Sequence, residues 1–292
     1  TFDGVHIGHA SVVDVVRKKS LEYGGNSVVL TFNPHPRVII DGPEAPGVLT
    51  NLAEKKWRIG SLGVDVLAVV QFTERLRSLS PQAFVESYLV EKLQPSAVVV
   101  GYDHGFGKDR SGGFETMRSL GDQFGFEVFS VPPILVENEP VSSSRVRDCI
   151  RDNRIEEAVE LLGAGFPIVG EVTPGEGIGR KIGFPTANVA YGGEGKLMPP
   201  AGVYAATASV PDRLGAVVNF GCRPTFNGKS RSLEAHILDF EGDLYGKEIK
   251  LELFSRLRGE QKFEHPTELV QQIQRDINSA RKILAHQEDI KH

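Results

Sequence analysis

Residues 27–32 read Ser-Val-Val-Leu-Thr-Phe, the first of four short apolar runs that decide the fold of the first part of the chain. The other runs span Val64 to Phe72, Ala97 to Gly101 and Glu127 to Val131. Short, β-branched, nearly continuous apolar runs are typical of strands buried on both faces of a parallel sheet. Between them lie helix-start signals; Ser80-Pro81 predicts a helix to about Leu93. Strand followed by helix, repeated, predicts a doubly wound α/β domain.

The character of the sequence changes after Leu162-Gly163. Glycine and proline become frequent, and turns replace helices between the expected strands. A last helix is expected after Pro266-Thr267, because apolar residues recur there at helical spacing. We therefore expect a first domain over residues 1–163 and, over residues 164–292, a small antiparallel β-barrel capped by a C-terminal helix. The expected strands span 202–208, 216–220, 233–240 and 249–254, and the helical stripe is Leu269, Ile273, Ile277, Ala280 and Leu284.

Composition and charge exclude several classes of protein. Of the 292 residues, 40% are hydrophobic and 24% charged, which excludes a mainly disordered chain. No window approaches the roughly 18 uninterrupted apolar residues of a membrane-spanning helix. The net charge of −5 provides no basic excess for holding long nucleic acid. Two distant cysteines and the lack of a signal peptide indicate a cytoplasmic protein without a disulfide scaffold.

The first nine residues, Thr-Phe-Asp-Gly-Val-His-Ile-Gly-His, carry the sharpest chemical signal. His6 and His9 share one face at the start of an expected helix, where free N–H groups and the helix dipole favour anions. Gly4 and Gly8 let backbone and phosphate approach closely. Nucleotidyl transfer needs such preorganised donors. Two other interpretations remain: a surface helix with incidental histidines, and a metal pair at His6 and His9 with His35 as third ligand.

Three later segments are expected at the same site. The first ends a strand at Asn33-Pro34-His35, where ligand crevices of open α/β sheets lie. The second is a glycine-rich loop over residues 101–107, and the third, residues 142–147, offers hydroxyls and guanidinium groups at a second helix start. Taken singly, the first segment is also explained as a proline turn, the second as a glycine loop and the third as a helix cap. Taken together and in this order, the three segments predict nucleotide binding. The candidate residues are Asn33, His35, Asp103, Arg110, Ser143, Ser144 and Arg145.

A second site is expected around residues 177–188. Thr186 and Asn188 present a hydroxyl and an amide oxygen two residues apart, which are hard, neutral ligands suited to Mg²⁺. Gly177 and Gly179 leave room for a triphosphate beside Arg180 and Lys181. On the expected strand 233–240, alternation places Glu234 with His236 on the polar face, where a carboxylate could accept a proton from a hydroxyl. From spacing alone, Glu234 is equally well explained as a solvated residue.

The order of the first-domain segments resembles the adenylyltransferase domain of bacterial bifunctional FAD synthetases, in the nucleotidyltransferase superfamily with the signature H-x-G-H. In the second domain, residues 179–188 (Gly-Arg-Lys-Ile-Gly-Phe-Pro-Thr-Ala-Asn) resemble the G-R-x-x-G-F-P-T-A-N signature of riboflavin kinase. Residues 219–226 and 234–240 are similar to that family's pattern as well. The resemblance covers essentially the whole chain. It implies that riboflavin is phosphorylated by ATP to FMN in the second domain, and that FMN and a second ATP give FAD and pyrophosphate in the first.

The resemblance also implies roles for individual residues. Glu234 is expected to be the base of the kinase, with Mg²⁺ held by Thr186 and Asn188. His6, His9 and residues 142–147 are expected to position ATP in the first domain, where the FMN phosphate is itself the nucleophile. Residues 256–263 resemble a flavin-contacting segment. The expected flavin contacts are Arg258, Gly202, Val203 and Tyr204.

The implied partners are the small molecules riboflavin, FMN and ATP, with no nucleic acid and no membrane, and the sequence is compatible with a homo-oligomer. We also expect this chain to lack the leading strand and the glycine that normally precede Thr1 in the family. Two alternative functions are an aminoacyl-tRNA synthetase relative of the same H-x-G-H fold and a flavin-binding module without catalysis. The first would need a basic tRNA surface, and the second is disfavoured because Thr186, Asn188 and Glu234 are all present.

Overall fold

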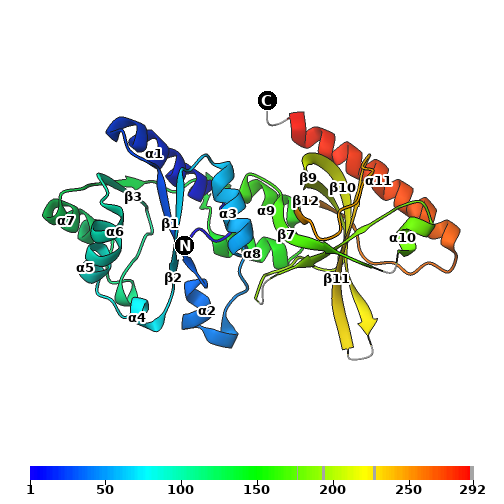
Figure 1. The fold of residues 1–292 in the computed structure, drawn as a ribbon, viewed down its shortest axis with the longest axis horizontal. Coiled ribbons are helices and arrows are strands. Elements are labelled where there is room, and N and C mark those ends of the chain that lie inside the picture. Colours follow the sequence, from blue (N-terminus) through cyan, green and yellow to red (C-terminus); the bar gives the residue numbers. More distant parts are fainter. Residues whose placement is uncertain (176, 193–194, 226–227, 290–292) are drawn as a thin grey trace. The chain divides into compact units, whose positions relative to one another are not determined.

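The computed structural model describes residues 1–175, 177–192, 195–225 and 228–289. The chain forms two compact units, Thr1–Ser143 and Ser144–His292 (Figure 1). No described helix has the length and apolar character needed to cross a membrane.

The first unit is an α/β domain with parallel strands, as predicted. Strand β1 (Val28–Asn33) pairs in parallel with β2 (Val66–Gln71), and β3 (Ala97–Gly101) pairs in parallel with β4 (Glu127–Val131). Helix α1 (Ile7–Tyr23) packs against β3 and β4. The other helices are α2 (Pro36–Ile40), α3 (Leu52–Ser61), α4 (Glu74–Arg77), α5 (Pro81–Phe84), α6 (Glu91–Leu93) and α7 (Phe114–Phe124), and a short hairpin joins β5 (Leu135–Val136) to β6 (Glu139–Pro140).

The structure corrects the expectation that all four strands are buried on both faces. In β2, Val66 is 43% exposed and Val69 is 37% exposed. Among the described residues, β2 pairs only with β1, so its other edge has no neighbouring strand. The strands also form two separate parallel pairs rather than one continuous hydrogen-bonded sheet in the described part of the chain.

The predicted helix from Ser80 to Leu93 is present, but it is not α-helical throughout. The Ser80 hydroxyl accepts a hydrogen bond from the Ala83 N–H at 3.2 Å, and Pro81 follows as the first helical residue, as expected for this start. Its middle, residues 85–90, has π-helical hydrogen bonding. Single π turns interrupt α-helices locally and leave no periodicity that a sequence pattern reveals.

The second unit is a closed six-stranded barrel with a long C-terminal helix, α11 (Pro266–Asp289), which confirms the predicted barrel and its capping helix. Around the barrel the order of the strands is β10-β11-β8-β7-β12-β9. Their bounds are β7 Phe166–Thr173, β8 Ala187–Tyr191, β9 Gly202–Val210, β10 Asp212–Thr225, β11 Gly228–Ile237 and β12 Glu248–Arg258. Shorter helices are α8 (Ser143–Arg151), α9 (Ile155–Leu162) and α10 (Ile178–Lys181). Strands β7 and β8 were not predicted, and the expected strand 233–240 ends at Ile237.

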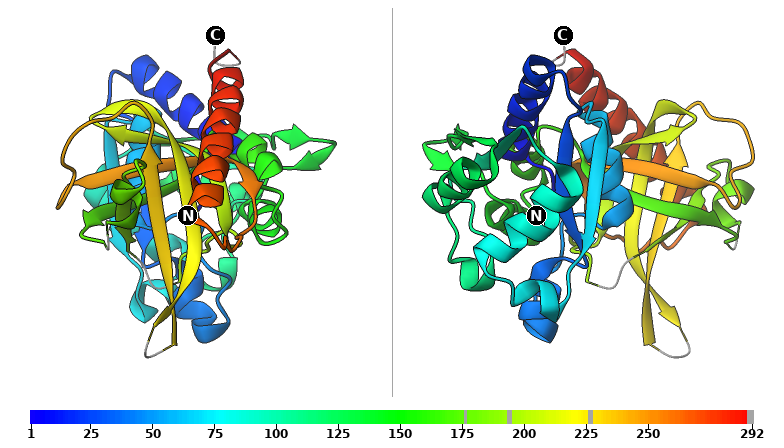
Figure 2. Two further views of the ribbon diagram at one scale, coloured as in Figure 1. Left: turned by 90° about the vertical axis from the view of Figure 1, so that its right-hand side faces the viewer. Right: turned by 60° about the vertical axis from the view of Figure 1, so that its left-hand side comes forward.

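Helix α11 lies along the outside of the barrel (Figure 2). Ile277, Ala280 and Leu284 of the predicted apolar stripe are buried. Ile277 and Ala280 pack with barrel residues that include Val203 and Leu238. Burial of this stripe therefore stabilises the packing of the helix on the barrel, by about 25 cal/mol for each Å² of apolar surface removed from water.

A buried ion pair also ties α11 to the barrel. The guanidinium of Arg258, near the end of β12, makes two-pronged contacts with the Asp276 carboxylate at 2.9–3.1 Å. The two side chains are 17% and 4% exposed. A planar guanidinium matches a carboxylate in this geometry, so the pair fixes the rotation of the helix on the barrel.

We expect Asp276→Asn to destabilise the second unit by about 3 kcal/mol, because it leaves a buried guanidinium without its counter-charge. The chain has one tryptophan, Trp57, which lies in α3 of the first unit. In urea unfolding, the transition of the second unit, followed by circular dichroism, should therefore shift to a lower urea concentration. The transition of the first unit, followed by Trp57 fluorescence, should not shift.

The matched control is the exposed pair between Arg281 of α11 and Asp239, whose nitrogen and oxygen are 2.7 Å apart. Asp239→Asn should cost less than about 1 kcal/mol, because water screens this pair. Equal effects of the two substitutions would contradict the role of the Arg258–Asp276 pair.

Candidate active sites

In the first unit, a buried carboxylate holds the turn that leads into α1. Asp3 is fully buried, and its carboxylate accepts hydrogen bonds from the N–H groups of Leu49 and Thr50 at 3.0–3.1 Å. The Thr50 hydroxyl accepts from the Gly4 N–H at 3.0 Å and lies 3.3 Å from the Asp3 carboxylate. Gly4 has a φ of 82°, a conformation that L side chains rarely adopt. The loop before α3 thus fixes the glycine turn.

The turn places the side chains of His6 and His9 next to each other. His6 is the N-cap of α1, and its Nδ1 accepts from the His9 N–H at 3.4 Å. The two rings stack at 3.7 Å between centroids, which confirms that they share one face. A Cβ at Gly8 would lie 3.2 Å from the His6 ring, so a side chain there would crowd it. Among the described side chains, the buried Nδ1 of His9 has no hydrogen-bond partner.

Burial sets the charge state of both imidazoles. It lowers the pKa of His6 to about 4, although the nearby carboxylates of Asp103 and Asp3 act in the opposite direction. Burial also holds the pKa of His9 well below its usual value, and the neighbouring His6 lowers it further. Both rings are therefore neutral near pH 7.

The later segments differ in the contacts that they make near the start of α1. The loop after β3 begins beside α1: a Cβ at Gly101 would lie 3.8 Å from the Asp103 carboxylate and 4.0 Å from the Val12 side chain of α1. The Ser143 hydroxyl donates to the backbone carbonyl of Asp3 at 2.9 Å, across 140 residues of sequence. Arg110 folds back on its own loop and donates to the Asp103 carbonyl at 2.9 Å.

The remaining candidates of the first site lie at the expected positions in the chain. Asn33 ends β1, and His35 is the N-cap of α2, where its Nδ1 accepts from the Arg37 N–H at 3.2 Å. Ser144 and Arg145 follow Ser143 in α8, but they belong to the second unit. The described residues contain no group of three or more His, Cys, Asp or Glu side chains that could hold a metal ion.

In the second unit, strand register brings the predicted kinase residues together. Glu234 on β11 is paired with Asn188 on β8 and, on its other side, with Asn219 on β10. The Thr186 hydroxyl lies 3.5 Å from a Glu234 carboxylate oxygen. Leu233, Ala235 and Ile237 are buried, so Glu234 lies on the opposite, polar face of the strand, as predicted.

Two glycines allow the backbone to approach the side chains of Asn188 and Thr186. A Cβ at Gly175 would overlap the side-chain amide of Asn188. A Cβ at Gly179 would overlap the Phe184 carbonyl and lie 3.2 Å from the Thr186 hydroxyl. Gly177 has a φ of 68° at the start of α10, where Arg180 and Lys181 are exposed. The predicted glycine-rich segment thus adjoins the Thr186, Asn188 and Glu234 cluster.

The predicted flavin-contacting residues Val203 and Tyr204 are buried. Val203 is 5% exposed, and the fully buried Tyr204 donates its hydroxyl to the Pro200 carbonyl. The Arg258 guanidinium is engaged with Asp276. A Cβ at Gly202 would lie 2.6 Å from the Arg258 carbonyl, so these two strand ends meet through their backbones.

Sequence reasoning missed several residues of both sites. It did not assign roles to Asp3 and Thr50, and it missed Lys55, a buried cation of α3 whose Nζ lies 3.4 Å from the Thr31 hydroxyl. Burial lowers the pKa of Lys55, and the charge of Asp3 opposes that shift. It also missed the side-chain contact that His236 makes with Pro185. Each of these contacts joins residues far apart in the sequence, so no local pattern reveals them.

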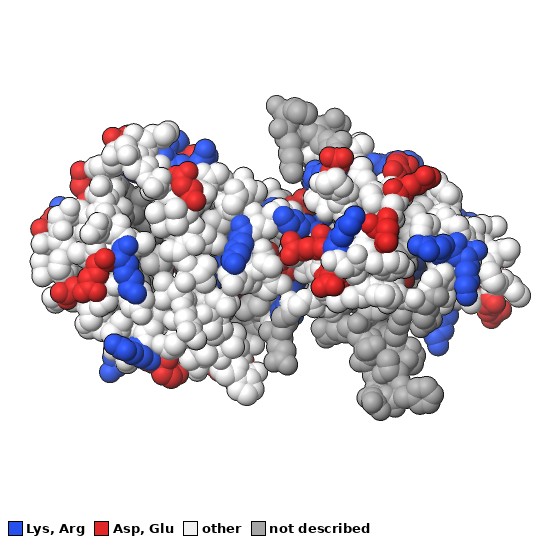
Figure 3. Space-filling view, in the orientation of Figure 1, with Lys and Arg blue, Asp and Glu red and all other residues white. Residues whose placement is uncertain are grey.

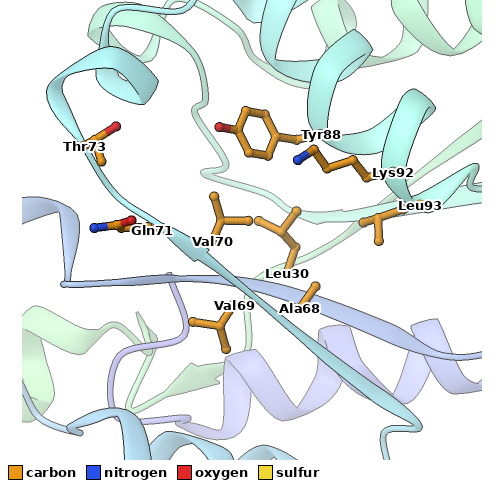
Figure 4. A pocket seen from close by; sticks show the side chains of 9 residues that line it. All are labelled: Leu30, Ala68, Val69, Val70, Gln71, Thr73, Tyr88, Lys92 and Leu93. Atoms are coloured by element: carbon orange, nitrogen blue, oxygen red, sulfur yellow. The ribbon is translucent and has the colours of Figure 1, made fainter.

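A cavity of about 440 Å³ lies against β1 and β2 of the first unit (Figure 4). Its wall is apolar, with Leu30, Val70 and the Tyr88 ring, and Lys92 and Gln71 supply polar groups. Its volume is in the range of small-molecule sites. Gln71 is paired with Asn33, so the cavity reaches the carboxyl ends of both strands. Sequence analysis did not predict it.

Charges of both signs are interspersed over the described residues on the face drawn in Figure 3. Local donors such as the backbone N–H groups at the start of α1 are groups that could orient an anionic ligand.

Comparison with known proteins agrees with two candidate sites in different parts of the chain. The FAD synthetase family model matches residues 1–145, and the riboflavin kinase family model matches residues 162–284. A bifunctional riboflavin kinase/FMN adenylyltransferase from Listeria monocytogenes is 37% identical over 292 residues, covering 99% of this chain and 92% of the relative. The Escherichia coli K12 protein of the same description is 36% identical and covers 96% and 90%.

A solved structure is also similar. It is described as a macrolide-efflux protein from Streptococcus pneumoniae, and it matches with a TM-score of 0.82 at 32% identity, covering 96% of this chain and 91% of the other. Near full-length relatives at this identity, together with a family model for each half, establish the family. The chain belongs to the bifunctional riboflavin kinase/FMN adenylyltransferase family.

Proposed function

We propose that Glu234 is the general base of a riboflavin kinase reaction in the second unit. The 5′-hydroxyl of riboflavin attacks the γ-phosphorus of ATP, its proton passes to Glu234, and the bond to the β-phosphate breaks to release ADP and FMN. The observation that carries this proposal is the register of β11, which pairs Glu234 with Asn188 while Thr186 lies 3.5 Å away. A carboxylate among neutral oxygen groups is suited to accept the proton of a hydroxyl.

The same cluster fits a magnesium ion. A hydroxyl, an amide oxygen and one carboxylate are hard oxygen donors, and Mg²⁺ is usually bound by one or two carboxylates together with substrate phosphates. Thr186 and Asn188 would hold it, as the sequence predicts. When bound, Mg²⁺ would neutralise charge on the phosphates of ATP. Gly177, Gly179, Arg180 and Lys181 border this cluster and supply space and cationic groups for the triphosphate.

For the first unit, we propose that FMN attacks the α-phosphorus of ATP. An FMN phosphate oxygen forms the new bond, pyrophosphate leaves, and FAD results. The FMN phosphate is already anionic, so the chain needs to supply orientation and donors rather than a base. The start of α1, with Gly4, His6, Gly8 and His9, would receive the triphosphate. The further nucleotide contacts proposed are Asn33, His35, Asp103, Arg110, Ser143, Ser144 and Arg145.

The proposed site of the first unit works with neutral imidazoles. Burial lowers the pKa of both rings, so each acts near pH 7 as a dipole with one N–H donor and one acceptor. Because His6 Nδ1 accepts from the His9 N–H, its proton lies on Nε2. Its N–H is thereby left to donate to a phosphate oxygen.

We place the functional boundary near residue 163, with an adenylyltransferase domain over 1–163 and a kinase domain over 164–292. Residues 146–161 lie outside both family models, and α9 packs against β7 and β12 of the barrel. For the flavin, we keep Gly202, Val203, Tyr204 and Arg258 as proposed contacts. Neither alternative from the sequence, a tRNA synthetase relative or a non-catalytic module, agrees with the names of the relatives.

The two proposed sites make a reciprocal prediction for substitutions. Glu234→Gln should lower FMN formation from riboflavin by about 10²- to 10⁴-fold, because the amide cannot accept the proton. FAD formation from supplied FMN should be unchanged. His9→Ala should lower FAD formation by about tenfold or more and spare FMN formation. Separation of riboflavin, FMN and FAD by chromatography measures both reactions in one sample.

Circular dichroism melting of each variant serves as the control for folding. A folded Glu234→Gln or His9→Ala protein that had lost both activities would contradict two separate sites. Full FMN formation by folded Glu234→Gln would contradict the proposed base.

The lowered histidine pKa values predict how the stability of the first unit depends on pH. Between about pH 6.5 and pH 4, the unfolded chain binds a proton at His6 that the folded chain does not bind, so stability falls as the pH falls through this window. From pH 7 to pH 5 the loss from His6 alone should be about 2 kcal/mol. Urea unfolding followed by Trp57 fluorescence measures it.

His6→Asn should remove this part of the pH dependence, because asparagine also caps helices but does not titrate. His286→Asn, on the exposed side of α11 in the second unit, is the matched control and should change nothing in the Trp57 transition. An unchanged pH dependence in His6→Asn would show that His6 is not the group responsible.

A further inference from the structure

We propose that His236 is a positioning residue of the kinase site, and that its ring N–H holds the Phe184-Pro185-Thr186 segment against β11. The proposal rests on the proposed function of Thr186 and Glu234. It assigns a role to a residue that lies two positions from Glu234 on the same polar face and takes no part in the chemistry.

The need for such a residue follows from the strand pairing. In the described part of the chain, β8 and β11 share two paired positions, Glu234 with Asn188 and Ala235 with Ala187. Continuing the antiparallel register would pair His236 with Thr186. Strand β8 begins at Ala187, so Thr186 lies just beyond the end of the ladder. Pro185, the residue before it, has no N–H to donate to a neighbouring strand.

A side chain replaces the missing backbone contact. The Nδ1 of His236 lies 2.8 Å from the Pro185 carbonyl oxygen. A carbonyl can only accept a hydrogen bond, so Nδ1 carries the proton and donates it. The bond ties the residue directly before Thr186 to the strand that carries Glu234.

Two further contacts limit the movement of the same segment. The Phe184 ring meets the His236 ring edge-on, with centroids 5.7 Å apart, and also packs against the apolar cluster beneath α11. The Phe184 N–H donates to the Gly179 carbonyl at 2.8 Å. The segment is thus held to α10 on one side and to His236 on the other. The 3.5 Å separation of Thr186 and Glu234 depends on both attachments.

Three substitutions test the geometry. Asparagine places an N–H donor near the position of Nδ1, glutamine places one near Nε2, and leucine places none. We expect His236→Leu and His236→Gln to lower kcat/KM for ATP in FMN formation by about 10- to 100-fold, the range found when the partner of a metal ligand is removed. His236→Asn should retain activity within about threefold of the unsubstituted chain. The KM for riboflavin should not change, because His236 is proposed to act on Thr186.

A binding measurement provides a readout without turnover. Riboflavin fluorescence, titrated with ADP and Mg²⁺, reports formation of the flavin–nucleotide complex; riboflavin lacks the phosphate that the first unit requires. His236→Leu should need about tenfold more Mg²⁺ for half-maximal change, and His236→Asn should match the unsubstituted chain. Formation of FAD from FMN and the circular dichroism melt serve as controls for folding and should be the same in all variants.

The outcomes separate this proposal from the function on which it rests. No FMN formation by the unsubstituted chain, or full activity in Glu234→Gln, would overturn the proposed function. With those intact, full activity and normal Mg²⁺ dependence in His236→Leu would overturn the role of His236. Equal losses in folded His236→Asn and His236→Leu would overturn it too, because the N–H at the Nδ1 position would then not be the operative group.

Discussion

The closure of the barrel between β8 and β11 is the constraint on which the second unit depends. The described strands share two paired positions there, and one of them joins Asn188 to Glu234. The seam that completes the barrel is therefore also the place where Asn188 and Glu234 meet. A shift of one residue would turn Glu234 into the core and Leu233 out of it, because alternate residues of a strand face opposite sides. Burial of apolar neighbours thus fixes the position of the carboxylate.

In the first unit, a buried charge instead fixes the positions of the segments around the candidate site. Asp3 lies at the centre of hydrogen bonds from the loop before α3, and the Ser143 hydroxyl reaches its backbone carbonyl. Buried carboxylates are retained only when such donors satisfy them. Two segments remote in sequence, near residues 50 and 143, are consequently fixed relative to the glycine turn. The site of the first unit is organised by hydrogen bonds to a turn, and that of the second by strand register.

The sequence predicted what depends on local pattern. Strands β3 and β4 have the predicted bounds, and α1 and α11 are present. His6 and His9 share one face and Glu234 lies on the polar face of its strand, as expected. What it could not predict depends on tertiary contact. The exposure of β2 follows from its place at an edge, and the Arg258–Asp276 pair from the docking of α11. Likewise, Thr50 and His236 contact residues about fifty positions away, so no spacing rule indicates these contacts.

The π-helical segment at residues 85–90 has a consequence for how the chain tolerates length changes. A π turn contains about one residue more than an α turn, so removing one residue there would let the helix become α-helical throughout. The shortened turn would still complete one rotation about the axis, so the residues after the deletion would keep their faces. Lys92 and Leu93 would continue to line the cavity beside β2. The π turn thus lets the chain take up one extra residue without turning the end of this helix away from the cavity.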